Sequence, residues 1–492
     1  MKFCVTTPIY YINGDPHIGH AYASIAADIL ARFKRLDGDE VHFSTGTDEH
    51  GIKVARSAET AGMDVYKFSD LMSQKFRDLG KVINLSEDDF IRTTEERHIV
   101  SSQQLWRRIS DDVYMGTYSG WYSARDEEYI PEEDLSDGKA PSGAPVEWME
   151  EESYFFRLSA YQDRLLELYE KNPDFIAPPS RRNEVISFVK SGLKDLSISR
   201  SKFDWGIPIP DAPGHVMYVW IDALANYITS LGFPENEERV AEMMANCVHV
   251  VGKEILRFHA VYWPAFLMSA GLPLPKRIFA HGWWTSEGQK MSKSIGNVVD
   301  PQKTVEKYGL DPIRYFFFRE IRFGEDGDFS EKSLQRRISY DLANDLGNLV
   351  QRVLAFVQKI GGLRVNYDFI EDERPLFEDS RSLMRKLRVL MDKQDLNGVL
   401  GEVWSLISAS NKFVDHMKPW ELVKDDEDKL NRVLTALCES LRAIAFGVAP
   451  FMPSTADKIF DFLNVDGKSF REIEVNFTDQ TFRPPFPLFP KE

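Results

Sequence analysis

Asp15-Pro16-His17-Ile18-Gly19-His20 joins a short apolar run, Phe3–Thr7, to a long helical repeat. The run predicts a buried strand, and Asp15 and Pro16 suit the N-cap and the first position of the following helix. Apolar residues at three- and four-residue spacing place one face of this helix against a sheet, and they are Ile18, Tyr22, Ile25, Ile29, Phe33 and Leu36. A second strand is predicted at Val41–Thr45. Strand, turn, helix and strand in this order open a doubly wound α/β domain with a Rossmann-type parallel sheet.

The two histidines of this segment lie three residues apart, so they share one face of the predicted helix. A helix N-terminus favours phosphate, because its amide N–H groups are unpaired and its dipole end is positive. Gly19 lacks a Cβ and lets a group such as an adenine ring approach the backbone. The imidazoles of His17 and His20 then provide N–H donors for a phosphate during transfer. Half of a metal site, or an ordinary polar helix start, fits the same pattern.

A second polar segment is Lys290-Met291-Ser292-Lys293-Ser294. It follows a predicted strand at Ile278–His281 and a predicted hairpin at 286–289, and it precedes a helix start at Asp300-Pro301. Two lysines and two hydroxyls in one loop can close over a triphosphate, with Lys acting as a point charge and Ser as a donor. A solvated basic loop is the alternative interpretation.

The composition is that of an ordinary globular protein, with 43% hydrophobic and 28% charged residues. A chain of 492 residues is long enough for roughly two to four domains. Cys4, Cys247 and Cys438 are scattered, which excludes a cysteine zinc knuckle and favours a reducing compartment, the cytoplasm. Neither a signal peptide nor a membrane span is expected. The net charge of −17 argues against a nucleic-acid partner, although a local basic face can coexist with an acidic surface.

The middle of the chain, from about Tyr114 to Gly214, is rich in Gly, Pro, Ser and acidic residues, and it predicts an inserted domain with little regular sheet. Strand character returns at Val216–Ile221, Val248–Gly252 and Ile278–His281. Beyond about Glu331 the apolar pattern is helical. The predicted domains are 1–113 (first half of the Rossmann domain), 114–214 (insertion), 215–275 (second half), 276–330 (Lys290 loop and linker) and 331–492 (α-helical domain and tail).

The two polar segments, in this order and in these contexts, resemble the HIGH and KMSKS signatures of class I aminoacyl-tRNA synthetases. Four blocks resemble the methionyl-tRNA synthetases in particular, and they are Thr6–Gly14, Gly46–Gly51, Tyr218–Tyr227 and Gly252–His259. The leucine, isoleucine and valine enzymes carry a large editing insertion, for which the stretch between His20 and Lys290 is too short. The cysteine enzyme binds zinc through thiolates, which the scattered cysteines here do not supply.

The resemblance implies an enzyme that activates L-methionine with ATP and Mg²⁺ and then transfers it to tRNA(Met), including the initiator tRNA. It implies catalytic roles for His17, His20, Lys290 and Lys293. The implied ATP-binding residues are His17, Gly19, His20, Lys253, Glu254, Lys290, Ser292 and Lys293. The implied methionine side-chain pocket consists of Ile9, Tyr11, Trp220, Ala223, Tyr227, Ile255 and His259, with Asp48 on the α-ammonium. The matching anticodon readers are Asn348, Arg352 and Trp420, and the helical domain is then the anticodon-binding domain.

The implied residue types suit these ligands. A thioether packs well against aromatic faces, and Tyr11 and His259 are placed to point a donor at the sulfur. Splayed RNA bases stack on a Trp face and bond to Asn and Arg through their edges. Ordinary core packing is the alternative for each aromatic residue, and a buried Trp with a surface Arg is the alternative for the anticodon readers.

The sequence departs from the family in the inserted domain. Many family members bind zinc there through cysteines, whereas this chain has Ser123 and Asp126 where a CxxC is expected. We therefore predict no structural zinc, and expect packing to hold the domain through Trp121, Tyr122, Tyr129 and Trp148. The family's appended C-terminal tRNA-binding module is also missing, which favours a monomer.

Two other functions remain open from the sequence. One is another adenylyl-transferring enzyme of the HIGH superfamily, which has no need of Trp420 or the helical domain. The other is a catalytically silent tRNA-binding paralogue, although such a protein has no reason to keep both signature segments intact.

Overall fold

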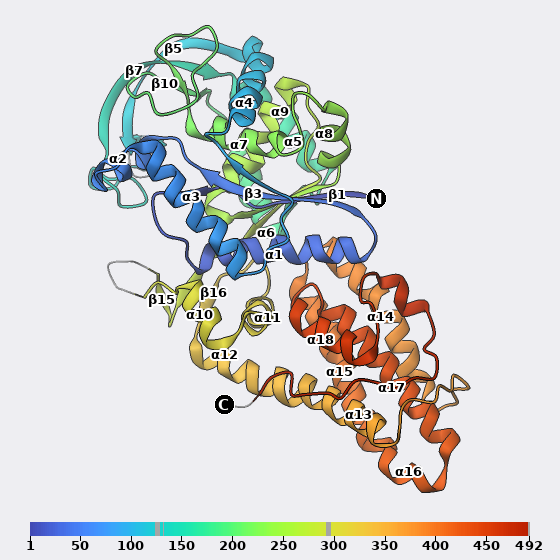
Figure 1. Cartoon of the computed structure of the whole chain (residues 1–492). Coiled ribbons are helices and arrows are strands. Elements are labelled where there is room, and N and C mark those ends of the chain that lie inside the picture. Colours follow the sequence, from blue (N-terminus) through green and yellow to red (C-terminus); the bar gives the residue numbers. More distant parts are fainter. Residues whose placement is uncertain (124–127, 131, 292–296, 491–492) are drawn as a thin grey trace. The chain divides into compact units, whose positions relative to one another are not determined.

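The computed structural model describes residues 1–123, 128–130, 132–291 and 297–490. The chain forms two compact units (Figure 1). We call Lys2–Ala27 together with Val41–His281 the sheet unit, and Met1, Asp28–Glu40 and Gly282–Glu492 the helical unit.

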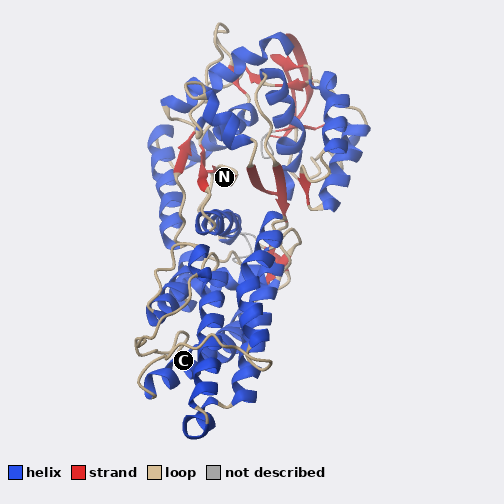
Figure 2. Ribbon diagram, turned by 90° about the vertical axis from the view of Figure 1, so that its right-hand side faces the viewer, coloured by secondary structure: helices blue, strands red, loops and turns tan. Residues whose placement is uncertain are grey.

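The sheet unit is built on a seven-stranded sheet of order β2-β3-β1-β12-β13-β8, with β4 paired to β3. Its strands are β1 (Lys2–Thr6), β2 (Tyr10–Tyr11), β3 (Glu40–Asp48), β4 (Asp89–Arg92), β8 (Ile176–Ala177), β12 (Cys247–Gly252) and β13 (Arg277–His281). The pairings β1–β12, β12–β13, β13–β8, β2–β3 and β3–β4 are parallel. Figure 2 shows these strands in red among the helices. The predicted Rossmann-type sheet is therefore confirmed.

The order of the strands reverses between β1 and β12. From β1 the chain continues to β3 on one side, whereas from β12 it continues to β13 on the other. Sheets of this type bind ligands at such a switch point, outside the carboxyl ends of the strands. Here those ends are Thr6 and Gly252. The residues just after them are thus the first candidates for a binding site.

Helix α1 (Ile18–Leu36) follows β1 as predicted but begins two residues later than expected. The carbonyl oxygen of His17 accepts from the N–H of His20 at 3.0 Å and of Ala21 at 3.3 Å, so His17 stands at the start of the helix. Asp15, the predicted N-cap, instead pairs with Lys75 at 2.6 Å. The prediction of an Asp15 cap is wrong, because the helix begins at Ile18 and the residue before it is His17.

The predicted strand at Val216–Ile221 is also wrong beyond its first two residues. β11 covers Val216–Met217 only, and α7 (Val219–Thr229) begins after an extended Tyr218. Short buried runs of apolar residues occur in strands and in helices alike, so periodicity does not separate them here.

The insertion contains more sheet than the sequence predicts. β5 (Val113–Ser123) and β7 (Glu147–Phe156) form a long antiparallel pair, flanked by β6 (Glu128–Ile130) and β9 (Leu196–Ser197). The expectation of little regular sheet is therefore wrong. Moreover, β8 lies within 114–214 but pairs with β13 in the main sheet, so part of that range belongs with the main sheet.

Aromatic packing lies on the antiparallel pair of the insertion. Trp121 and Trp148 are cross-strand partners, with ring centroids 5.4 Å apart and nearly perpendicular planes. Tyr122 is buried. Tyr129 belongs to β6, but its side chain and all of Asp126 lie outside the described residues.

The remaining elements of the sheet unit surround these sheets. They are α2 (Ile52–Thr60), α3 (Val65–Val82), α4 (Glu96–Ile109), α5 (Gln162–Lys171), α6 (Pro179–Lys190), α8 (Glu237–Met244), α9 (Trp263–Ala270) and β10 (Ser199–Arg200). In the described ranges, no helix has the length and apolar character needed to span a bilayer.

The helical unit opens with a small sheet of β14 (Trp284–Ser286), β15 (Gln289–Lys290) and β16 (Gly327–Phe329). The predicted hairpin between β14 and β15 is confirmed, and its turn residues Glu287 and Gly288 have φ values of 50° and 76°. The predicted helix start at Asp300-Pro301 is confirmed too, because the Asp300 carboxylate accepts from the N–H groups of Gln302 and Lys303.

Helices account for most of the rest, as the apolar pattern predicts. They are α10 (Pro301–Tyr308), α11 (Leu310–Glu320), α12 (Glu331–Arg337), α13 (Asn348–Lys359), α14 (Arg374–Asp392), α15 (Leu396–Met417), α16 (Pro419–Asp425), α17 (Glu427–Val448) and α18 (Pro453–Leu463). A π-helical stretch, Ile338–Gly347, joins α12 to α13.

A fully buried ion pair ties elements of the helical unit together. The Arg314 guanidinium of α11 donates to the Asp28 carboxylate at 2.6 Å and to the carbonyl oxygens of Phe451 and Pro450. Arg32 donates to the same carboxylate at 2.6 Å. Burial lowers the pKa of Arg314 and Asp28 opposes this effect. The Asp28 carboxylate is thus the hydrogen-bonded counter-ion of this guanidinium, and Asp311 adds a weaker attraction.

Replacing Asp28 by Leu is expected to destabilise the helical unit by about 3–5 kcal/mol, because it leaves a buried guanidinium without its counter-ion. Urea unfolding followed by tryptophan fluorescence measures the change. The double variant Asp28→Leu/Arg314→Met is expected to recover most of the loss. Glu167→Gln, which removes an exposed helical ion pair with Lys171, is the control and leaves the midpoint unchanged. A loss below about 1 kcal/mol for Asp28→Leu would contradict the assignment.

Candidate active site

The histidine pair at the start of α1 is held by backbone amides. The N–H of His17 donates to Nδ1 of His20 at 3.1 Å, and the N–H of Gly19 donates to Nδ1 of His17 at 3.1 Å. The centroids of the two imidazole rings are 3.8 Å apart. Since each Nδ1 accepts, each neutral ring carries its proton on Nε2. The pair therefore offers two Nε2–H donors rather than two bases.

The surroundings of His20 keep it uncharged. Its ring lies edge-on to Tyr10 at 4.7 Å and to Phe76 at 5.2 Å. Burial, followed by the nearby His17, holds the pKa of His20 well below 6.5. Burial also raises the pKa of Tyr10 to about 12, so its hydroxyl stays protonated and bonds to Ser24. The side chains of His20 and Tyr10 are therefore uncharged at physiological pH.

Gly19 lies closely against the imidazole ring of His17. A Cβ at this position would lie 3.0 Å from Cε1 of His17. An alanine would thus press on the imidazole that the Gly19 amide holds in place. The contact between Gly19 and His17 is independent of the close approach of an adenine ring, which the sequence predicts at Gly19.

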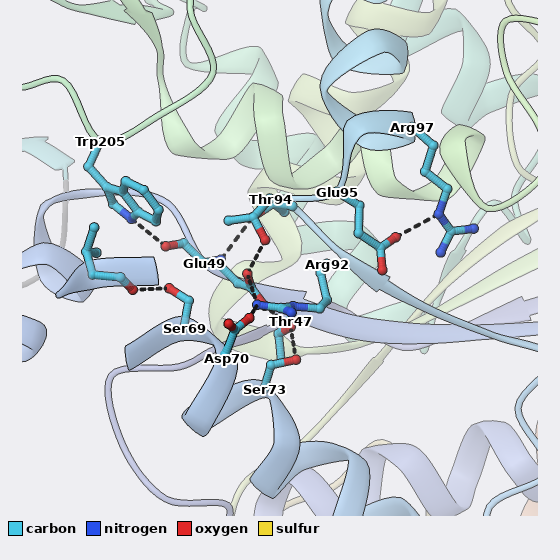
Figure 3. A network of polar contacts seen from close by, with 12 residues as sticks. Thr47, Glu49, Ser69, Asp70, Ser73, Arg92, Thr94, Glu95, Arg97 and Trp205 are labelled. Atoms are coloured by element: carbon cyan, nitrogen blue, oxygen red, sulfur yellow. Dashed lines mark hydrogen bonds and ion pairs between the residues drawn. The ribbon is translucent and has the colours of Figure 1, made fainter. Parts of the chain in front are cut away.

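The block that follows β3 is anchored through Glu49 (Figure 3). Its buried carboxylate accepts from both ends of the Arg92 guanidinium, at 2.7 and 3.0 Å, and from the hydroxyls of Thr47 and Thr94 at 2.8 and 2.5 Å. The backbone of Glu49 is held as well, because its carbonyl accepts from Trp205 Nε1 at 2.6 Å. Neighbouring Asp48, buried and paired in register with Tyr11 of β2, is consequently fixed in position.

A second buried carboxylate, Asp222, lies on the first turn of α7. Its two oxygens accept from His50 Nδ1 and His98 Nε2, each at 2.7 Å. Burial alone would raise the pKa of Asp222, but the two histidines outweigh it and the pKa falls below 3.8. Asp222 is therefore ionised, and both histidines donate to it.

The aromatic side chains of α7 and the segment after β12 form a packed group. Trp220 stacks on Phe258 with ring centroids 3.6 Å apart, and the Tyr227 hydroxyl bonds to His259 Nε2 at 2.6 Å. His259 Nδ1 lies 2.9 Å from the carbonyl oxygen of Ile255, so Nδ1 donates and Nε2 accepts from Tyr227. Burial lowers the pKa of His259 to about 4. The suggestion that His259 points a donor at a methionine sulfur is therefore wrong in this conformation.

The predicted methionine and ATP residues of the sheet unit follow the carboxyl ends of β1, β3 and β12 or lie on the adjoining α1 and α7. Ile9 is buried just beyond β1, and Lys253 and Glu254 come directly after β12. The ring of Tyr11 lies 4.8 Å from the Lys53 ammonium. Ala223 is buried on α7, between Trp220 and Tyr227 in sequence. Thus they gather about the edge of the sheet where the strand order reverses.

The predicted basic loop belongs to the helical unit. Lys290 is the last residue of β15, but its side chain lies outside the described residues, as do Ser292 and Lys293. Their place beside a triphosphate stays a prediction.

The predicted anticodon readers come together in the helical unit. Arg352 of α13 lies over the ring of Trp420 at 5.9 Å and pairs with Asp415 at 2.7 Å. Trp420 is 49% exposed, so about half of its side chain is accessible to a ligand. Asn348 is exposed one turn before Arg352 on the same helix.

Sequence reasoning did not identify Glu49 and Asp222 as anchors. One signal was present, because Asp222 is the one charged residue in the apolar helix Val219–Thr229, and such a carboxylate needs a buried partner. No local pattern indicated that His98 is a partner of Asp222 or that Arg92 is a partner of Glu49.

Comparison with known protein families assigns both parts of the chain. A model described as tRNA synthetases class I (M) matches residues 3–145 and 133–354. A model of the anticodon-binding domain of methionyl tRNA ligase matches residues 366–482. The fold and these matches define a class I aminoacyl-tRNA synthetase with its anticodon-binding domain, and they exclude an adenylyl transferase that lacks one.

Individual relatives narrow the assignment. The methionine–tRNA ligase of Rickettsia felis is 52% identical over 94% of this chain and 92% of its own length, and that of Brucella suis is 50% identical over 100% and 98%. A structure of the Mycobacterium tuberculosis methionyl-tRNA synthetase in complex with methionyl-adenylate has a TM-score of 0.95 at 46% identity, covering both chains completely. The apo form of that enzyme has a TM-score of 0.89 at 43% identity, over 100% of this chain and 98% of its own. The chain belongs to the methionyl-tRNA synthetase family and is a methionine–tRNA ligase.

Replacing His259 by Asn is expected to weaken the pH dependence of stability. The folded pKa of about 4 lies below the ordinary value of 6.5, so the unfolded chain takes up a proton first and stability falls as the pH drops from 6.5 towards 4. The difference in the free energy of unfolding between the wild type and the variant is thus expected to decrease by about 2 kcal/mol between pH 7 and pH 5. Urea unfolding at both pH values measures it, and a constant difference would refute a neutral His259.

Proposed function

We propose that this ligase acts in two steps at the carboxyl edge of its main sheet. An oxygen of the methionine carboxylate attacks the α-phosphorus of ATP, forming methionyl-adenylate as pyrophosphate leaves. A ribose hydroxyl at the 3′ end of tRNA(Met) then attacks the adenylate carbonyl carbon, and AMP leaves. The observation that carries this proposal is the histidine pair, whose two amide-held rings present Nε2–H donors beside the strand switch point.

The ATP site is proposed around this pair. His17 and His20 donate to phosphate oxygens as charge shifts onto them, which requires preorganised donors and no side-chain nucleophile. Gly19 permits the two rings and the nucleotide to lie close together. Lys253 and Glu254, which follow β12, are assigned to the same nucleotide by the family resemblance.

The methionine site is proposed on the other elements of this edge. Asp48 binds the α-ammonium, and Glu49 with its partners keeps Asp48 in place. The side chain enters the pocket of Ile9, Tyr11, Trp220, Ala223, Tyr227, Ile255 and His259. Because both nitrogens of His259 are engaged, we assign its contribution to shape and to contact of the sulfur with aromatic faces.

Charge compensation for the triphosphate is proposed to come from Lys290 and Lys293, with Ser292 as a donor. The described residues contain no group of three or more His, Cys, Asp or Glu side chains suited to a metal ion. Mg²⁺ commonly binds through nucleotide phosphates with few protein ligands. We therefore expect Mg²⁺ to accompany ATP and to neutralise phosphate charge there, and we assign it no protein ligand.

Anticodon recognition is proposed for the surface formed by Asn348, Arg352 and Trp420. The exposed indole offers a stacking face, and the Asn and Arg side chains offer edge contacts to a splayed base. We propose that both elongator and initiator tRNA(Met) are recognised in this way. A cytoplasmic monomer is the expected form of the enzyme.

Replacing His20 by Ala is expected to lower the rate of methionine-dependent ATP–pyrophosphate exchange by about 10²–10³, the loss typical of one preorganised donor. Steady-state exchange measures it, with unfolding midpoints confirming the fold. His416→Ala, which alters an exposed histidine of α15, is the matched control with unchanged exchange. Exchange within about threefold of wild type for His20→Ala would remove His20 from the ATP site.

Replacing Trp420 by Ala is expected to reduce kcat/KM for tRNA aminoacylation by roughly 10- to 100-fold, since base stacking on an aromatic ring contributes that much. Pyrophosphate exchange needs no tRNA, so it is expected to stay at the wild-type rate and serves as the internal control. Equal losses in both assays would contradict an anticodon role.

A further inference from the structure

The carboxylate of Asp222 is completely buried and has a histidine partner on each oxygen. One oxygen accepts from His50 Nδ1 and the other from His98 Nε2, each at 2.7 Å. His50 and His98 are themselves buried. A buried charge of this kind contributes little to stability compared with apolar packing, and its attested use is to specify one geometry.

The three residues come from parts of the site that are distant in sequence. His50 follows Asp48, the proposed ammonium ligand, by two positions. Asp222 lies on α7 between the proposed pocket residues Trp220 and Ala223. The hydrogen bond between them therefore joins the ammonium side of the methionine site to its side-chain wall.

His98 of α4 holds α7 at a second point. Its Nδ1 lies 3.2 Å from the Thr229 hydroxyl, and Thr229 is the last residue of α7. Asp222 and Thr229 are seven residues apart, about two helical turns, so they share one face of α7. One imidazole thus contacts both ends of the helix that carries Trp220 and Tyr227.

The chemistry of the carboxylate fixes the geometry. An ionised carboxylate only accepts, so both histidines must present N–H groups to it, which sets their tautomers and ring planes. A neutral residue of the same size does not impose this on both partners. A leucine would fill the space without orienting either ring.

We infer that Asp222 is a positioning residue for methionine, which holds α7 and the Asp48 block in the relative placement that the substrate requires. It acts through His50 and His98. This inference rests on the proposed methionine pocket and adds residues that lie outside the pocket itself.

The isosteric variant Asp222→Asn tests the inference. Its amide group presents a donor to one of the two histidine N–H groups, so one hydrogen bond is lost and one partner is displaced. We expect the KM for methionine in pyrophosphate exchange to rise about tenfold or more, in line with loss of a charge-assisted hydrogen bond. We expect the KM for ATP to be unchanged and kcat to stay within about threefold.

A merely structural role gives a different result. Loss of folded enzyme lowers kcat and leaves both KM values as in the wild type, and that outcome overturns the inference. Asp311→Asn is the matched control, because Asp311 is a buried carboxylate of the helical unit that accepts from Thr455. This control is expected to keep the wild-type KM for methionine.

A second variant covers the case in which Asp222→Asn does not fold. His98→Asn keeps the bond between Asp222 and His50 but removes the bonds of the His98 imidazole to Asp222 and Thr229, and we expect the KM for methionine to rise about threefold or more. Where Asp222→Asn does fold, the two effects are expected to be less than additive in the double variant, since both residues act on one helix. Full additivity overturns the shared mechanism.

Trp220→Ala, which removes an aromatic ring from the proposed pocket, separates failure of this inference from failure of the proposed pocket. If this variant raises the KM for methionine and Asp222→Asn does not, the pocket stands and the positioning role is wrong. If neither variant raises it, the pocket itself is misassigned and the inference falls with it.

Discussion

The parallel pairing of β1 with β12 is the contact on which the site depends. Cys4, Val5 and Thr6 lie opposite Cys247, Val248 and His249, each 243 residues further along the chain. Side chains reinforce the register, since Thr6 Oγ1 lies 2.8 Å from His249 Nδ1 and the two cysteine sulfurs are 3.0 Å apart. The ring of Tyr227 stacks on His249 at 4.0 Å. A slip of one residue would turn His249 to the other face of the sheet and remove the support beneath Tyr227. The register of β1 against β12 therefore also determines the position of Tyr227 in the proposed pocket.

Periodicity predicted the parts of the fold in which one pattern dominates. The α1 stripe, the buried run at Val248–Gly252 and the helices beyond Glu331 have a single interpretation, and the structure agrees with them. The insertion was misjudged because its glycines and acidic residues occur within a long antiparallel pair, where one face of each strand is exposed. The start of α1 was misplaced because Asp15 and Pro16 are also common in the turn before a helix, and the helix begins only at Ile18. Local signals thus predict elements well and their ends less well.

The candidate site likewise contains residues that the sequence predicts and residues that it does not. His17, His20 and the pocket aromatics lie in recognisable segments, so the sequence was sufficient to name them. The anchors lie elsewhere, since His98 and His50 are 124 and 172 residues from Asp222. A single sequence carries no sign of which distant polar residue satisfies a buried carboxylate. The net charge of −17 was misleading for a related reason, because it argued against a nucleic-acid partner in a tRNA ligase. Charge summed over the chain does not describe the small surfaces on which RNA or ATP is bound.

The buried histidines of the sheet unit orient neighbouring groups without carrying a charge, although the substrate is a polyanion. Burial lowers the pKa of His20, His249 and His259, so the rings near the strand switch point orient neighbours without adding charge. Neutral N–H donors that are already oriented stabilise negative charge as it develops on the phosphates. The compensating positive charge then has to come from groups outside this buried cluster, which is the role proposed for the lysines of the Lys290 segment. Separating orientation from charge in this way is compatible with a buried, ionised Asp222 in the sheet unit.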